Sequence, residues 1–156
     1  MSRPLLEAAT LNRAYLQSPV DDLLSFYYVA QWAAVNNNTY FRGSPPVPDE
    51  LGLLRDRLGG SLAEGELGTS TITAGRVRPT SYGRFLADCQ PILREWHEKL
   101  RELVDDWAAA IESVAPDVAD QYKTYHPLFC EFTDRGVLEV LEVVQRHFAG
   151  HLQACA

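Results

Sequence analysis

The amino-acid sequence predicts an all-α protein, an irregular four-helix bundle that forms a single domain over residues 1–156. Two observations predict this fold. Ser, Thr or Asp residues, some with a nearby Pro, mark several helix starts. Two long stretches also repeat apolar residues at the i, i+3, i+4, i+7 spacing of a helix with one buried face. Hydrophobic residues make up 46% of the chain and charged residues 22%, so an ordinary globular core is expected.

The first two predicted helices lie near the N-terminus. An amphipathic stretch runs from Ser2 to about Gln17, and Ser18 with Pro19 opens a second helix that ends near Asn36. The second stretch is apolar almost all round. This pattern predicts a central helix that packs on more than one side.

A long crossover is expected between the second and third principal helices. It holds a short helix from Asp49 to about Arg57, which Gly59 and Gly60 end. Residues 61–80 contain a run of β-branched residues but no evident partner strand. They are therefore predicted to be coil.

The third principal helix follows Thr80 and Ser81 and extends to about Val114. Pro91 lies inside it, and because proline removes a backbone hydrogen bond, the helix is expected to kink or restart there. Its apolar face carries the expected rhythm from Leu93 onward.

The fourth principal helix is predicted to begin at Thr133 and Asp134, after a short helical turn that ends near Tyr125. It runs to about Ala154. Its apolar side chains are expected to point inward, and these are Val137, Val140, Leu141, Val144, Phe148 and Leu152.

Composition also limits the classes of function. The net charge of −7 disfavours nucleic-acid binding, which needs basic side chains against phosphates. No apolar run reaches the roughly 18 residues of a membrane span, so a cytoplasmic protein without a membrane partner is expected. Cys89, Cys130 and Cys155 are far apart and form no CxxC pair, which predicts buried free thiols.

The last predicted helix carries two histidines that point toward the bundle on a helical wheel. His147 and His151 are four residues apart, so their imidazoles lie one turn above each other and can share a metal ion. His97 lies in the apolar stripe of the third helix. In an antiparallel hairpin, His97 is 17 residues before an end at Val114 and His151 is 17 residues after a start at Asp134, which predicts that the imidazoles converge.

Three neutral imidazoles with an open fourth position make a Lewis-acid site for a divalent metal. The alternative is that His97, His147 and His151 are structural residues, each hydrogen-bonded to a carbonyl group or to water. His126 precedes Pro127 and is predicted to be a loop or capping residue.

The segment from His126 to Leu138 and the segment from Arg146 to Gln153 together resemble the C-terminal part of the DinB-like superfamily. In that family a His-Pro turn and a Thr cap precede a helix with an HxxxH pair. The resemblance implies a four-helix bundle that binds zinc or nickel through histidines, His147 and His151 here, and a transferase or hydrolase acting on a thiol or another small molecule. The family's first metal histidine lies on its second helix, whereas residues 1–96 contain no histidine.

A second hypothesis is a non-catalytic interaction or ligand-binding module, such as an immunity-like protein or a dimerising partner protein. The second helix is rich in aromatic residues, and Tyr27, Tyr28 and Trp32 are its candidate contact surface. A homodimer is one form that this hypothesis predicts.

Overall fold

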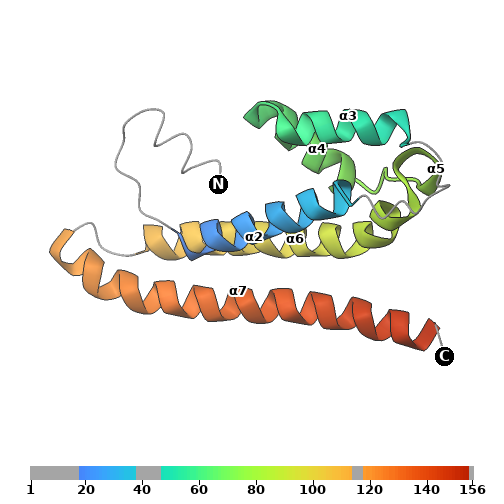
Figure 1. Cartoon of the computed structure of the whole chain (residues 1–156). Helices are drawn as coiled ribbons and strands as arrows, with labels where there is room; N and C mark the ends of the chain where they lie inside the picture. The colour runs from blue at the N-terminus through green and yellow to red at the C-terminus, as the bar shows by residue number, and fades with distance from the viewer. Residues whose placement is uncertain (1–17, 38–46, 114–117, 155–156) are drawn as a thin grey trace. The chain divides into compact units, whose positions relative to one another are not determined.

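The computed structural model describes residues 18–37, 47–113 and 118–154, without the side chains of 118–124 and 150–154. Within this part of the chain there are six helices and no strand, so the predicted all-α class is confirmed (Figure 1). No helix among the described residues is long and apolar enough to cross a membrane. The helix predicted over residues 2–17 lies outside the described residues.

The chain divides into two compact units. The first consists of residues 1–26 and 96–156, and the second of residues 27–95. The helices α2 (Pro19–Val35) and α6 (Arg84–Glu112) each contribute to both units. The arrangement of four helices as one bundle stays a prediction.

The start of α2 is capped as its sequence predicts. Ser18 Oγ accepts a hydrogen bond of 3.1 Å from the Val20 N–H, and the Asp21 carboxylate accepts one of 2.9 Å from the Ser18 N–H. These bonds satisfy backbone donors that the first turn of a helix leaves without partners. Because Ser18 and Asp21 are both buried, water could not replace these bonds.

The second unit contains α3 (Asp49–Gly59), α4 (Leu62–Thr73) and α5 (Pro79–Tyr82). The short helix predicted from Asp49 is confirmed as α3. The prediction that residues 61–80 are coil is wrong, because α4 and α5 lie there.

A capping box explains the start of α4. Ser61 Oγ accepts a hydrogen bond from the Glu64 N–H at 3.4 Å, and Glu64 Oε2 accepts one from the Ser61 N–H at 2.7 Å. The Ser61 N–H and the Ser61 hydroxyl both donate to the Glu64 carboxylate, and these two bonds lower the pKa of the Glu64 carboxyl below its ordinary value. This cap and the burial of Ile72 outweigh the strand preference of the β-branched residues.

A buried polar pair joins α2 to α4 inside the second unit. The Gln31 amide nitrogen donates to Thr69 Oγ1 at 3.1 Å, and the Thr69 hydroxyl donates to the Gln31 amide oxygen at 3.2 Å. Both residues are buried. At the end of α2, Arg55 Nε donates to the Val35 carbonyl at 3.0 Å, so a cation meets the negative end of the helix.

The long helix α6 differs from the prediction in two places, at its start and at Pro91. Gly83 has a φ of 83°, a left-handed conformation that separates α5 from α6. Of the kink or restart predicted at Pro91, the restart is not observed, because α6 continues through this residue as one helix. Pro91 is exposed, so water can reach the Ala87 carbonyl that loses its N–H donor.

The last helix is longer than the sequence predicts. Helix α7 (Val118–Ala154) runs without a break through Pro127, so the predicted start at Thr133 and Asp134 is wrong. The Thr133 hydroxyl does not cap a helix. It donates to the Phe129 carbonyl one turn earlier, at 2.7 Å. His126 therefore lies on α7 and not in a loop.

Candidate functional site

An aromatic cluster packs α7 against α6 within the first unit. The Trp107 ring on α6 makes edge contacts with Phe132, Phe129 and Tyr125 on α7, at centroid distances of 5.3, 6.5 and 5.8 Å. Trp107 and Phe132 are buried. Large aromatic side chains contribute much of the free energy of such contacts, so this cluster anchors the N-terminal half of α7.

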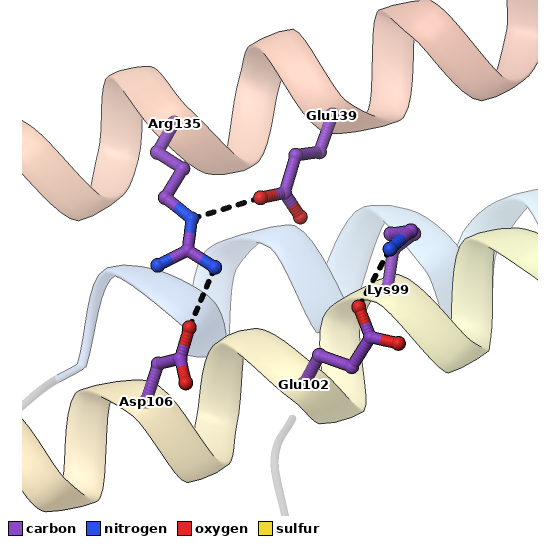
Figure 2. Close-up of polar contacts among 5 residues, drawn as sticks. All are labelled: Lys99, Glu102, Asp106, Arg135 and Glu139. Carbon is purple, nitrogen blue, oxygen red and sulfur yellow. Dashed lines mark hydrogen bonds and ion pairs between the residues drawn. The ribbon is translucent and has the colours of Figure 1, made fainter.

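Arg135 links the two helices a turn further along α7 (Figure 2). Its guanidinium donates to Asp106 on α6 at 2.6 Å and to Glu139 on α7 at 2.8 Å. Hydrogen bonds to Glu139 and then to Asp106 raise the pKa of Arg135. All three side chains are partly exposed, so these ion pairs add little stability. The Arg135–Asp106 pair favours one register of α6 on α7.

At Gly136, helix α7 lies close to both α2 and α6 within the first unit. A Cβ atom at this position would overlap Leu23 Cδ1 on α2 and would lie 2.7 Å from Leu103 Cδ2 on α6. Leu23 and Leu103 are both buried. Only a residue without a side chain allows α7 to approach the other two helices this closely.

These contacts define how α6 and α7 run past each other. Leu103 lies beside Gly136 and Asp106 beside Arg135, so the two helices are antiparallel. His97 is six residues before Leu103 and nine before Asp106, which brings it level with the α7 segment from Glu142 to Val144. On a helix rising about 1.5 Å per residue, His147 is then about one turn beyond that level and His151 about two turns.

The His97 imidazole is half-buried on α6. Its burial, and then the nearby charge of Arg101, lower its pKa below the ordinary value near 6.5, while Glu98 acts in the opposite direction. The lowered pKa favours the neutral form of the His97 imidazole. An imidazole must be neutral to bind a metal.

The two other predicted metal ligands lie on α7. His147 is half-buried, and the side chain of His151 lies outside the described residues. Among the side chains that the structure describes, no group of three or more His, Cys, Asp and Glu residues is arranged to hold a metal ion. The start at Asp134 used to compare levels is wrong, but the three-histidine site itself stays a prediction.

The prediction that the cysteines are buried is wrong for Cys130. Cys130 is exposed on α7, with its Sγ 3.9 Å from Nδ1 of the exposed His126 one turn earlier. Cys89 is half-buried, and burial, followed by the charge of Asp88, raises the pKa of its thiol. Cys155 lies outside the described residues.

Helix α7 exposes a group of large apolar side chains. The exposed fractions are 42% for Val137, 60% for Leu138, 48% for Leu141 and 60% for Phe148. These four residues are called the α7 apolar face below. Val144 is half-buried and lies on the same side of the helix as Val137, Leu141 and Phe148.

The prediction that Val137, Leu141 and Phe148 point into the core is therefore wrong. The buried side of α7 is centred on Phe132, Gly136 and Val143, about a third of a turn away on the helix. The sequence pattern is misleading because α7 has apolar residues over more than half of its circumference, and the described part of the chain covers only some of them. Gly136 is the sequence signal that was missed, since a glycine inside a strongly helical segment often marks a close helix contact.

The aromatic residues of α2 do not form the predicted contact surface as a group. Tyr27 is fully buried and Tyr28 half-buried, and their rings make an edge contact at 5.5 Å. Burial raises the pKa of both hydroxyl groups. Trp32 is 59% exposed, so it alone of the three is open to a partner among the described residues.

These observations define an all-helical protein with an apolar surface on its last helix. Comparisons with protein-family models, with curated proteins and with solved structures find no match to this chain.

Proposed function

We propose that this protein is a non-catalytic interaction module that binds a partner through the α7 apolar face. The observation that carries the proposal is the exposure of four large apolar side chains along one side of a single helix. Single exposed apolar residues are ordinary on a protein surface. A contiguous group of them commonly marks an interaction site.

The helix that presents this face is held in place before any partner binds. Within the first unit, the Trp107 cluster and the Gly136 contact pack α7 against α6 and α2, and the Arg135–Asp106 ion pair favours one register of α7 on α6. A preorganised surface loses little conformational entropy on binding. The best partner is another amphipathic helix, because its apolar side can lie along that of α7.

Placing a charge at the centre of the face tests this function. The variant Leu141→Glu puts a carboxylate there, and Leu53→Glu is the matched control because Leu53 is 57% exposed on α3. Tagged versions are purified from cells that express the chain naturally. We expect the amount of protein that co-purifies with Leu141→Glu to be at least about tenfold lower than with the wild type, because a carboxylate in an apolar interface is left without a partner.

The control variant should retain those proteins, and circular dichroism should show that both variants are folded. Recovery of the same proteins at the same level with Leu141→Glu would contradict the proposal.

A second candidate function is the binding of a divalent metal, zinc or nickel, by His97, His147 and His151. The lowered pKa of the half-buried His97 supports it, because metal binding needs a neutral imidazole. The DinB-like resemblance adds the expectation of a transferase or hydrolase acting on a thiol or small molecule. A bound zinc or nickel ion would supply Lewis-acid chemistry there.

Metal titration of the purified chain tests this second candidate. We expect about one equivalent of zinc or nickel to bind, with His97→Ala and His147→Ala each weakening binding at least about tenfold. His126→Ala is the matched control, since His126 is exposed on α7. No uptake of metal, or an equal loss with His126→Ala, would refute a site at these histidines.

A further inference from the structure

The spacing of the apolar row on α7 reads the same in both directions. Val137, Leu141, Val144 and Phe148 are separated by four, three and four residues. When a second α7 runs antiparallel to the first, this row can lie on its own copy. Val137 then faces Phe148 of the other copy, and Leu141 faces Val144.

We propose that the partner bound by the α7 apolar face is a second copy of this chain, packed antiparallel across a twofold axis near Glu142 and Val143. This inference rests on the proposed function and names its partner. Intervals of four and three residues are those at which helices pack side chains into each other's gaps. A twofold interface also requires one patch to be complementary to itself, as this row is.

The pairing also suits the sizes of the side chains. Val137 is small and faces the large Phe148, whereas Leu141 faces the smaller Val144. Layers that place a large residue against a small one fill the space between two helices without overlap. A parallel pair would instead place Phe148 against Phe148 and Val137 against Val137.

Charged side chains lie away from the row between residues 137 and 148. The positions that border it are Leu138, Val140, Gln145 and His147. Glu139, Glu142 and Arg146 lie on the opposite part of the helix circumference, at about 100° per residue. The acidic chain therefore brings no carboxylates against each other at the centre of this interface, which is where interfaces are depleted of charge.

The exposed area indicates how large the dimer interface is. Four side chains of about 150 Å² each, roughly half exposed, offer about 300 Å² per copy, or about 600 Å² of apolar surface in the pair. With the polar rim, the interface reaches about 1,000 Å², the lower end for specific complexes. We therefore expect a weak, reversible dimer.

Sedimentation of the full chain between about 1 and 300 μM, under reducing conditions, measures this equilibrium. The wild type is expected to shift from monomer to dimer over that range. Leu141→Glu should raise the Kd at least about tenfold, whereas Leu53→Glu should leave it within about twofold of wild type. Leu138→Gln is a milder second variant at the edge of the face and should weaken the dimer less than Leu141→Glu.

A spin label distinguishes the two orientations. In a background with the three native cysteines replaced by serine, Glu131→Cys carries one label per copy outside the apolar row. In the antiparallel arrangement the two copies of residue 131 lie about 23 residues apart along the helix axis, or about 35 Å. In a parallel pair they lie within about 20 Å of each other. A distance near 35 Å that disappears with Leu141→Glu supports the proposal, and a short distance overturns it.

A wild-type chain that stays monomeric at 300 μM overturns the second-copy proposal. If Leu141→Glu nevertheless loses accompanying proteins from cells, the proposed function stands with a different partner. If Leu141→Glu loses neither dimer nor partner, both proposals fail. A monomer that Leu141→Glu strongly destabilises also counts against the dimer, because the chain itself then covers the face.

Discussion

Replacing Gly136 by alanine tests the close contact among α2, α6 and α7. In an ordinary helix interior this change is favourable by about 1 kcal/mol, because alanine loses less backbone entropy than glycine. Here the added methyl group would meet Leu23 and would lie 2.7 Å from Leu103 Cδ2. Their exposed fractions are 8% and 0%, so neither leucine has room to move aside.

Overfilling a packed site costs about 1–3 kcal/mol. After the helix preference is subtracted, Gly136→Ala is expected to lower the free energy of unfolding by about 1 kcal/mol. Gly52→Ala on α3 is the matched control, because a Cβ there meets nothing within 4 Å. The control should gain about 0.5–1 kcal/mol.

Urea denaturation followed by far-UV circular dichroism measures both changes. With a denaturant slope of about 2 kcal/mol per molar urea, the two variants should have midpoints separated by about 1 M. A Gly136→Ala midpoint equal to that of Gly52→Ala would refute the reasoning. It would mean that α7 does not approach α2 and α6 as closely as the contact requires.

Three further predictions follow from other contacts. Gln31→Leu and Thr69→Val should each lower the free energy of unfolding by about 1–3 kcal/mol, because each leaves the other buried side chain without its hydrogen-bond partner. In a double-mutant cycle, the double variant should lose less stability than the sum of the two single variants. Ser61→Ala should cost about 1 kcal/mol through loss of the α4 cap, measured by thermal unfolding, with Ser70→Ala on the exposed surface of α4 as the control. Because the pKa of His97 is lower in the folded chain, the unfolded chain binds a proton at this residue at a higher pH than the folded chain does. The free energy of unfolding should therefore fall as the pH drops below about 6.5. Unfolding free energies of the wild type and of His97→Gln between pH 5 and 8 should converge at the high end, and parallel curves would argue against a desolvated imidazole.

Much of the helical fold could be predicted from local signals. Ser18 and Pro19 predict the start of α2, and the structure shows the capping bonds that this pattern implies. The start of α4 was missed although Ser61 and Glu64 have the spacing of a capping box. The β-branched residues after it drew the prediction toward coil, because residue preferences are weaker than a satisfied helix start combined with a buried side.

The candidate site was harder to predict, because an apolar stripe does not state what covers it. Val137, Leu141 and Phe148 have the spacing of core residues, and they would be buried if this stripe were the side of α7 that packs against the other helices. The position of Gly136 decides which side of α7 meets α2 and α6. That side excludes part of the stripe, and the excluded part is the surface proposed here for binding.

The level of the histidines depended on a helix boundary. With α7 beginning at Val118, the contacts of Arg135 and Gly136 fix which residues face each other. They bring His97 closer to the level of His147 than to that of His151. A sequence pattern alone could not supply this register, because Thr133 and Asp134 look like a helix start within a continuous helix.

Methyl NMR of the full chain, with leucine and valine labelled, tests the central claim most directly. As the concentration rises from about 10 to 300 μM, the methyl signals of Val137, Leu138 and Leu141 should shift together, while those of Leu53 and Leu62, which are exposed in the second unit, should not. Such a pattern would show that the α7 apolar face becomes covered when two chains meet. Unchanged α7 signals over the whole range, or shifts confined to Leu53 and Leu62, would contradict the account.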